Sequence, residues 1–426
     1  MVGASSAPEK YGYIILKNIL DGGFCGPVYP VNPRAGKILG LPSVPSIAAL
    51  PPGVDLALII IPARTVPQAL AEAGQHGIKS AIVISGGFAE SGDEGATLQR
   101  EVVEVARRSG IRVVGPNCQG VNNPHQGLCA SWPLLTQAGE IAVVSQSGTV
   151  GAALMDWASQ ERLGCSIFVS LGNRADIDET DVIEYLASDP HTQAIAIYLE
   201  GIKDLDRFRQ VVAGCKKPIV ILKAGRTAEG RRAAESHTRS LAGRDELYTA
   251  LFRQLRVHRA DSLEDLYDAA KALAYLPRPA GRRILTITSS GGSGILATDW
   301  AEWSGLAIAP LPDDVAETLR GLLPSHCIVA NPLDLTGDAT AALYRKVVEA
   351  TATHVDYQVI IFGDPILDAA EVVSSGAPQL AIFLGGGDIE RRERERMHLK
   401  KIPVFPAPER GIRALARLFA YEQVPL

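Results

Sequence analysis

One histidine of this chain stands in a setting that could support nucleophilic chemistry. His237 lies in the segment AAESHTRSLAG (233–243), between small residues and a glycine, with two hydroxyl side chains and an arginine beside it. Two interpretations fit the pattern: a structural histidine satisfied by a neighbour, or a nucleophile at the start of a helix. Because a solitary histidine says little without partners supplied by the fold, the segment alone favours the structural role.

A carboxylate that could face this histidine is Glu200, which ends the apolar run AIAIYLEG (194–201). A carboxylate bonded to one imidazole nitrogen fixes the tautomer and leaves the other nitrogen nucleophilic. The plainer interpretation is a solvated glutamate at the end of a strand. The segment GNRADIDETD (172–181) adds four carboxylates before a helix, and there Asp178 or Thr180 is expected to cap that helix.

Hydroxyl side chains gather around a glycine in SQSGTVG (145–151), after one predicted strand and before a predicted helix. Free backbone N–H groups at the helix start, together with these hydroxyls, would form a cradle for a phosphate. The predicted phosphate-binding residues are Ser145, Ser147, Gly148 and Thr149. The loops VGASSAPEKYG (2–12) and SSGGSGILATDWA (289–301) are built similarly, and each fits an anion-binding loop or an ordinary turn equally well.

The elements that must position these residues form three α/β blocks, because continuous β-branched apolar runs alternate with helical stretches. The predicted domains are residues 1–126, 127–276 and 281–426. The strands are expected at 28–32, 55–62, 80–85 and 111–116, at 140–146, 165–172, 194–201 and 218–225, and at 283–289, 357–363, 380–386 and 402–406. The chain starts where a first strand should already be ending, so that strand is expected to be clipped or to begin upstream. Ligands of such sheets bind at the carboxyl ends of the strands.

Composition excludes several classes of protein. The 426 residues are 46% hydrophobic and 21% charged, which is enough for several buried cores, and the net charge of −5 gives no reason to expect nucleic acid or an anionic membrane. The 6 cysteines lack CxxC spacing, which indicates reduced thiols and argues against zinc. No run approaches the roughly 18 apolar residues of a membrane span, and no signal peptide is recognisable. We therefore expect a soluble, cytoplasmic protein.

Seven segments, in this order, resemble the NDP-forming acyl-CoA synthetases, specifically their α-subunit portion, to which the succinyl-CoA synthetase α subunit is related. The segments are VGASSAPEKYGYIILKNILDGGFCGPVYPVNPR, GPNCQGVNNP, SQSGTVGAALMDWA, GNRADIDETD, YLEG, SHTRSLAG and NPLDLTGD, and they cover nearly the whole chain. The resemblance implies an α/β fold class: a CoA-binding Rossmann-like domain followed by two flavodoxin-like domains with doubly wound parallel sheets. The first of these two would carry a phosphorylatable histidine.

The resemblance also implies roles for particular residues. His237 matches the family's histidine that accepts and relays a phosphoryl group, Glu200 matches the glutamate that orients it, and Asn117 matches the acyl-phosphate pocket. The positions matching CoA-binding residues are Gly3, Ser5, Ser6, Asn32, Pro33, Arg34, Ser85, Gly86 and Gly87. No metal ligand is expected in this chain.

The implied reaction is acid + CoA + ATP ⇌ acyl-CoA + ADP + phosphate, with a small carboxylic acid and coenzyme A as substrates. ATP, ADP and Mg²⁺ would be bound by a separate ATP-grasp β subunit in a hetero-oligomer, since no ATP-grasp segment occurs here. Arg239 stands where the family usually has glycine, and it would either contact the phosphate or narrow the histidine loop. The alternative function is a non-catalytic acyl-CoA-binding or regulatory protein that kept the fold.

Overall fold

The computed structural model describes residues 1–420 apart from 35, 134, 136 and 239–243. Contacts divide the chain into two compact units. The first unit comprises Met1–Gln160 and Gly164–Arg259, and the second comprises Glu161–Leu163 and Ala260–Leu426.

The first unit opens with a parallel three-stranded sheet in the order β3-β4-β5. Its elements are α1 (Tyr11–Asp21), β1 (Lys37–Ile38), β2 (Leu41–Pro42), η1 (Ile47–Ala49), β3 (Leu56–Ile59), η2 (Ala63–Thr65), α2 (Val66–Gln75), β4 (Ser80–Val83), η3 (Ala89–Ser91), α3 (Asp93–Ser109) and β5 (Arg112–Val114). Helices α2 and α3 pack on the face that carries Ile59 and Val83, while α1 packs on the opposite face, which carries Leu58 and Ile82.

The strand predicted at 28–32 is wrong. Only Val31 takes part in pairing there, through isolated bridges to Val2 and Val44. Pro30 and Pro33 flank Val31 and have no N–H to donate, so a continuous ladder cannot form around it. Val2 also bridges β3 at Ile59, which places the start of the described chain beside this sheet.

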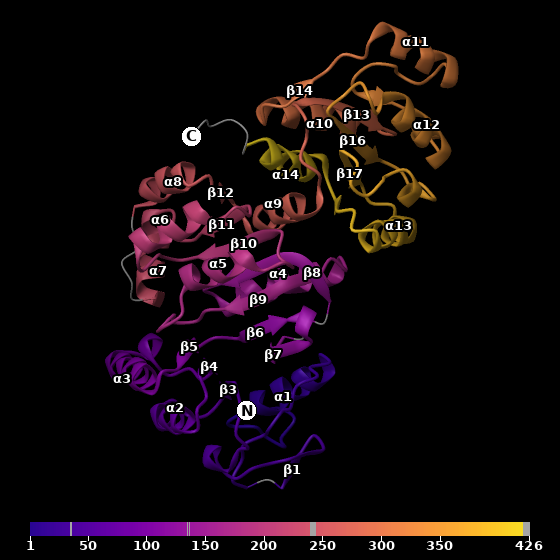
Figure 1. Ribbon diagram of the computed structural model, residues 1–426. Coiled ribbons are helices and arrows are strands. Elements are labelled where there is room, and N and C mark those ends of the chain that lie inside the picture. The colour runs from indigo at the N-terminus through magenta and orange to yellow at the C-terminus, as the bar shows by residue number, and fades with distance from the viewer. Residues whose placement is uncertain (35, 134, 136, 239–243, 421–426) are drawn as a thin grey trace. The chain divides into compact units, whose positions relative to one another are not determined.

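A seven-stranded sheet fills the rest of the first unit, in the order β12-β11-β10-β8-β9-β6-β7. Its elements are β6 (Gly120–Asn123), η4 (Pro124–Gln126), β7 (Leu128–Ser131), β8 (Ala138–Ser145), α4 (Gly148–Gln160), β9 (Cys165–Ser170), α5 (Glu179–Ser188), β10 (Ala194–Leu199), α6 (Leu205–Gly214), β11 (Ile219–Lys223), α7 (Ala228–Thr238), α8 (Asp245–Gln254) and β12 (His258–Arg259). Strands β8 to β12 run parallel, while β6 pairs antiparallel with β7 and β9 (Figure 1). Thus β6 belongs to this sheet although it precedes residue 126, where the sequence predicts a domain boundary.

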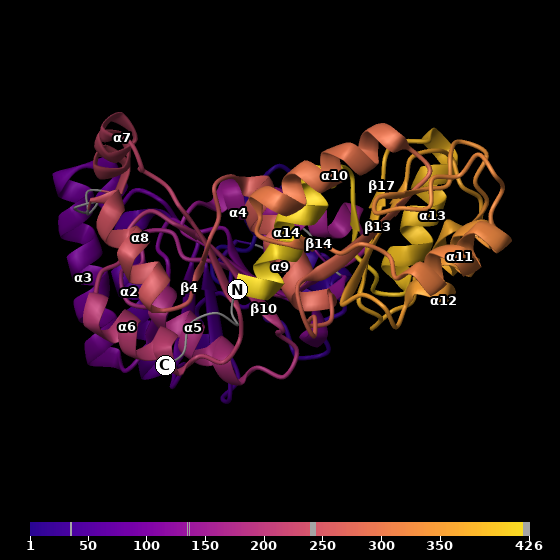
Figure 2. The ribbon, with the colours of Figure 1, turned by 90° about the horizontal axis from the view of Figure 1, so that it is seen from above.

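The second unit holds a parallel sheet in the order β14-β13-β16-β17-β18, with β15 also pairing with β13. Its elements are α9 (Leu263–Tyr275), β13 (Arg283–Thr288), α10 (Gly291–Trp303), β14 (Ala307–Ile308), α11 (Asp313–Leu322), β15 (Leu333–Asp334), α12 (Ala341–Thr351), β16 (Tyr357–Phe362), η5 (Ala369–Glu371), β17 (Gln379–Phe383), α13 (Gly387–Leu399), β18 (Val404–Phe405) and α14 (Pro408–Ala420). Helices α9, α10 and α14 pack on one face of the sheet, and α11, α12 and α13 pack on the other (Figure 2).

A buried ion pair ties the three-residue segment Glu161–Leu163 into this second unit. The Lys271 ammonium is fully buried, and it donates to the Glu161 carboxylate at 2.9 Å and to the Val404 carbonyl at 3.1 Å. The Tyr267 hydroxyl donates to the same carboxylate at 2.9 Å. Lys271 therefore depends on a partner that lies more than 100 residues earlier in the chain.

Candidate active site

The order of the strands in the larger sheet defines where a ligand should bind. From β8 the chain continues to β9 on one side, and then crosses to β10 on the other side of β8. In such sheets the crevice at the carboxyl ends of the two diverging strands is the usual ligand site. Ser145 is paired with Tyr198 at the ends of β8 and β10, so SQSGT and Glu200 leave the sheet side by side.

The loop after β8 leads directly into α4. The buried Ser145 hydroxyl donates to the Ser147 carbonyl at 2.5 Å, and the Val150 N–H reaches the Ser147 hydroxyl at 3.5 Å. A Cβ on Gly148 would lie 2.5 Å from the side chain of Gln119, which explains the glycine. Because α4 begins at Gly148, its free N–H groups lie in the same loop as the Ser147 and Thr149 hydroxyls.

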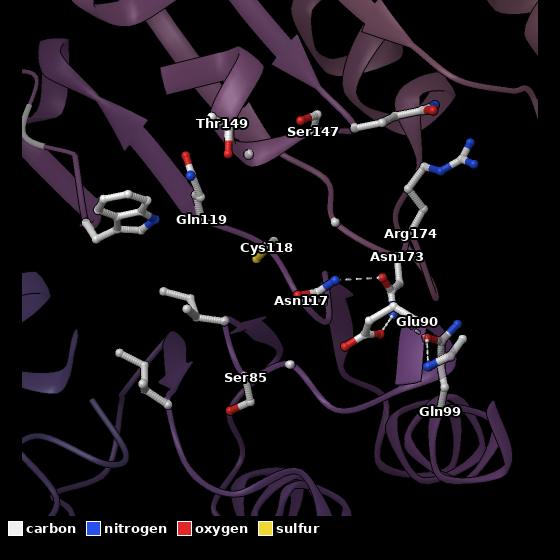
Figure 3. A pocket seen from close by; sticks show the side chains of 18 of the residues that line it. Ser85, Glu90, Gln99, Asn117, Cys118, Gln119, Ser147, Thr149, Asn173 and Arg174 are labelled. Carbon is white, nitrogen blue, oxygen red and sulfur yellow. Dashed lines mark hydrogen bonds between the residues drawn. The ribbon is translucent and has the colours of Figure 1, made fainter. Parts of the chain in front are cut away.

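A cavity of about 490 Å³ opens at this point (Figure 3). Loops following β4, β5, β8, β9 and β10 all contribute to its lining. The predicted site residues that line it are Ser85, Gly86, Asn117, Ser147, Gly148, Thr149 and Glu200. The fold therefore brings together residues that are more than 100 positions apart in the sequence.

Glu200 is held by its neighbours at the end of β10. Its backbone N–H donates to the Gln146 side-chain oxygen at 2.7 Å, and its carboxylate accepts a hydrogen bond from Tyr198. Burial, the charge of Glu200 and this hydrogen bond together raise the pKa of the Tyr198 hydroxyl to about 12. Tyr198 therefore stays protonated as a donor to Glu200 at neutral pH.

Asn117 takes part in a hydrogen-bonded chain across the cavity. Its side-chain N–H donates to Asn173 at 3.2 Å, and Asn173 donates to Glu90 at 2.5 Å and to Gln99 at 2.8 Å (Figure 3). Glu90 also accepts from the Gly87 N–H at 2.6 Å. Burial raises the pKa of Glu90, but the hydrogen bonds from Asn173 and the backbone outweigh it and hold the pKa below its usual value. These hydrogen bonds thus connect the loop after β4 to the loop after β9.

The remaining residues predicted to bind CoA do not all lie in one cavity. Gly3, Asn32, Pro33 and Arg34 line a second cavity of about 480 Å³ in the smaller sheet's part of the first unit. Ser5 and Ser6 line neither of these two cavities, and Ser5 accepts a hydrogen bond from the Ala7 N–H at 3.1 Å as in an ordinary turn. The Ser85 hydroxyl is bonded to both backbone groups of Ile61, so it joins the loops after β3 and β4.

His237 lies at the end of a helix, whereas the sequence suggested a position at a helix start. It belongs to the last turn of α7, not to a helix start, because the helical pattern extends upstream to Ala228. Its side chain and the whole of Arg239 lie outside the described residues. Helix α7 contacts η3, and Ala89 and Glu90 of η3 line the larger cavity.

Several carboxylates of GNRADIDETD have structural roles. Asp178 caps α5, accepting from the N–H groups of Thr180 and Asp181, which confirms the capping interpretation for Asp178. Asp176 and Asp181 both pair with Arg112. Similarly, Ser290 caps α10 in the SSGGSG loop, so an ordinary capped turn accounts for that hydroxyl.

Sequence inspection overlooked Arg174 and Gln146. The Arg174 guanidinium is 4% exposed and pairs with the fully buried Glu179 at 3.0 Å. Gln146 donates to the same carboxylate at 3.1 Å while its oxygen accepts from Glu200. Burial raises the pKa of Glu179, and the charge of Arg174 opposes that rise. Both residues lie within the motifs singled out above, but only the fold shows their contacts.

In the part of the chain that the structure describes, no helix is long and apolar enough to cross a membrane. Within the same residues, no group of three or more His, Cys, Asp or Glu side chains could hold a metal ion. Cys118 lines the larger cavity, and burial raises the pKa of its thiol to about 12.

Known proteins match all three parts of the chain. Residues 1–124 match the CoA binding domain, residues 138–273 the succinyl-CoA ligase like flavodoxin domain, and residues 284–365 the ligase-CoA domain. The chain is 38% identical to the α subunit of acetate–CoA ligase (ADP-forming) I from Pyrococcus furiosus, over 99% of this chain and 96% of that protein. It is 40% identical to acetate–CoA ligase (ADP-forming) I of Archaeoglobus fulgidus, over 100% of this chain but only 62% of that protein.

A solved structure agrees with these matches. It is the dinucleotide forming acetyl-coenzyme A synthetase 1 of Ca. Korarchaeum cryptofilum, in complex with phosphate and ADP, with a TM-score of 0.91 and 36% identity over 99% of this chain and 94% of that chain. The predicted fold class is thereby confirmed, while the exact domain boundaries stay predictions. The chain belongs to the NDP-forming acyl-CoA synthetase family, and it is an enzyme subunit that corresponds over its length to the α subunits of the ADP-forming acid–thiol ligases.

Proposed function

We propose that this chain carries out the acyl-CoA half of the synthetase reaction in the cavity between β8 and β10. The observation that carries the proposal is the convergence of Asn117, Ser147, Gly148, Thr149 and Glu200 on that one cavity. In the direction of acid release, a phosphate oxygen attacks the thioester carbonyl of acyl-CoA. The C–S bond breaks, CoA leaves with a proton, and acyl phosphate remains.

The second step transfers the phosphoryl group to His237. One imidazole nitrogen attacks phosphorus, the bond from phosphorus to the acyl oxygen breaks, and the carboxylate leaves. Glu200 accepts a hydrogen bond from the other imidazole nitrogen and offsets the positive charge that develops on the ring. The N–H groups of α4, with Ser147, Gly148 and Thr149, hold the phosphoryl oxygens, while the buried Ser145 hydroxyl shapes the loop through its bond to the Ser147 carbonyl.

CoA would extend from the second cavity toward the first. Gly3, Asn32, Pro33 and Arg34 line the second cavity, where the guanidinium suits a phosphate of CoA. Ser5 and Ser6 belong to the neighbouring loop, and Ser85, Gly86 and Gly87 would guide the pantetheine arm toward Asn117.

The nucleotide half would belong to a partner. Relatives of similar length are named α subunits, and the chain leaves more than a third of the Archaeoglobus protein unmatched. We infer that an ATP-grasp β subunit binds ATP, ADP and Mg²⁺ and exchanges the phosphoryl group with His237 in a hetero-oligomer. The acid is a small carboxylic acid, to be identified with a panel of acids in the presence of the partner.

The decisive experiment is phosphoryl labelling of the chain alone. Incubation with acetyl-CoA and [³²P]phosphate should label the protein through an acid-labile, base-stable bond, as expected for phosphohistidine. His237→Ala should abolish the label, whereas His191→Ala, which changes an exposed histidine outside the site, should retain it. Full labelling of His237→Ala would overturn the mechanism. CoA binding without any labelling by a set of acyl-CoA esters would favour the non-catalytic alternative.

A further inference from the structure

The charges around the larger cavity are unbalanced. Among the described residues that line it, Glu90 and Glu200 carry negative charge and Arg174 supplies the one side-chain cation. A phosphate entering this space meets two carboxylates, of which Glu200 is buried and Glu90 half-buried. Any oxyanion bound here therefore needs an opposing charge beyond the partial charge of a helix N-terminus.

Two of the three nitrogens of the Arg174 guanidinium make no hydrogen bond to the described residues. Nη1 donates to Glu179 at 3.0 Å and to the Gly201 carbonyl at 2.7 Å, which accounts for both of its hydrogens. No contact with the described residues uses Nη2 or Nε. Those two nitrogens form a planar donor pair of the kind that binds carboxylate or phosphate oxygens in a bidentate manner.

The position of this side chain suits an anion at the end of β10. The Gly201 carbonyl that it contacts directly follows Glu200, so the guanidinium lies at the end of β10. Figure 3 shows the Arg174 side chain rising from the loop of Asn173, away from Ser85, with its guanidinium at the margin of the cavity. Arg174 and the start of α4 thus line the same cavity.

The backbone of Arg174 adds an independent observation. Its φ is 54°, in the left-handed region that a residue with a Cβ adopts only at a cost. The conformation is held by the bond from the Ala175 N–H to Gly115 at 2.9 Å and by Lys203, which donates to the Arg174 carbonyl. Strained residues that are over-determined in this way cluster at ligand sites.

We propose that Arg174 binds the oxyanion that enters the cavity lined by Ser147 and Glu200, with Nη2 and Nε as a bidentate donor pair. Glu179, on the far side of the guanidinium, keeps the fork in this orientation. This assignment rests on the proposed function, in which the oxyanion is a phosphate or a phosphoryl group. The carboxylate of the acid is a planar anion whose two oxygens can likewise accept from the same donor pair.

The test is direct binding of [³²P]orthophosphate, and in parallel [¹⁴C]acetate, to the whole chain by equilibrium dialysis. Arg174→Gln should weaken binding of at least one of these anions about tenfold to a hundredfold, because a charge-assisted bond to a buried partner is lost. Arg174→Lys should recover part of the affinity. The anion that is affected identifies the source, and CoA affinity should stay unchanged.

Glu179→Gln is the matched control, since it breaks the same ion pair but keeps the guanidinium. It should retain anion binding within about threefold of the original chain, because the glutamine oxygen can still accept from Nη1 and hold the fork in place. Equal losses in Arg174→Gln and Glu179→Gln would mean that the pair has only a structural role, and unchanged binding of both anions in Arg174→Gln would also overturn the proposal. Phosphate binding does not require His237. A chain that binds phosphate through Arg174 but is not labelled would therefore contradict the proposed phosphoryl transfer and leave the assignment of Arg174 standing.

Discussion

Single residues at this site act through their neighbours. Glu200 cannot be assigned a role from its position at the end of an apolar run, because most glutamates at such places are solvated. In the fold its backbone N–H donates to the Gln146 side chain, its carboxylate accepts a hydrogen bond from Tyr198, and it lines the cavity. A carboxylate held in this way can select one tautomer of an approaching imidazole without moving.

Glu200→Gln should lower the initial rate of phosphoprotein formation about tenfold to a hundredfold. The amide keeps the size of the side chain but no longer offsets the charge that develops on the imidazole ring. Rapid-quench labelling with acetyl-CoA and [³²P]phosphate measures this rate.

Tyr198→Phe provides the control, because it removes the donor to Glu200 but leaves the carboxylate in place. Its rate should fall by less than about fivefold. If Glu200→Gln labels as fast as the unmodified chain, Glu200 has no role in phosphoryl transfer.

At the scale of elements, close contacts between loops limit which residue types fit in the turns. With its amide oriented to satisfy both of its neighbours, Gln119 donates to the Gly148 carbonyl at 2.7 Å and accepts from the Trp132 indole at 3.3 Å. A loop from the strand β6 region therefore supports the start of α4. The loop after β8 is thus supported by the residue that directly precedes β6, the strand that pairs antiparallel with β9.

Gly148→Ala should displace Gln119 and reduce the labelling rate about tenfold, since overpacking of a tight contact costs roughly 1–3 kcal/mol. Gln119→Ala should restore much of the rate when combined with Gly148→Ala, because the clash is with a side chain. The double-variant cycle, measured by labelling kinetics, checks this coupling.

Gly172→Ala gives the contrasting case. A Cβ there would meet the Pro116 carbonyl, a backbone atom, and φ is +55°. No side-chain truncation should rescue that variant. Failure of Gln119→Ala to improve Gly148→Ala would show that the glycine is needed for another reason.

The elements also show what the sequence could predict. Parallel strands such as β8 and β16 were recognisable because burial on both faces requires continuous β-branched runs. The hairpin of β6 and β7 was missed because GVNN and LCAS lack that signature, and two-residue strands such as β14 leave no periodicity to detect. The motifs predicted seven cavity-lining residues, but Arg174 was missed since only the fold brings it to the Gly201 carbonyl and to the cavity.

At the scale of the whole molecule, the pairing of Lys271 with Glu161 links distant parts of the chain within the second unit. Glu161→Gln should destabilise that unit by about 3 kcal/mol, because the fully buried ammonium loses its main counter-charge. Asp268, at 3.7 Å from the Lys271 ammonium, limits the loss. Chemical denaturation followed by tryptophan fluorescence measures the change in the free energy of unfolding.

Adding Lys271→Met to Glu161→Gln should recover part of the stability, since an apolar side chain no longer needs the carboxylate. Equal stability of Glu161→Gln and the unmodified chain would show that Asp268 and the Val404 carbonyl suffice for the ammonium.

The same segment has a consequence for proteolysis and for gene rearrangement. Because Glu161–Leu163 belongs to the second unit, the chain passes between the units three times, after Gln160, after Leu163 and after Arg259. A protease that cuts once near residue 260 would break the backbone between the two fragments, but the short peptide Glu161–Leu163 of the first fragment would still be packed non-covalently in the second unit. A recombination event that transplanted only residues 260–426 would deliver a Lys271 without its acid. Exchange of this module between genes should therefore lower its stability wherever the recipient supplies no equivalent of Glu161, with Asp268 as the remaining carboxylate near Lys271.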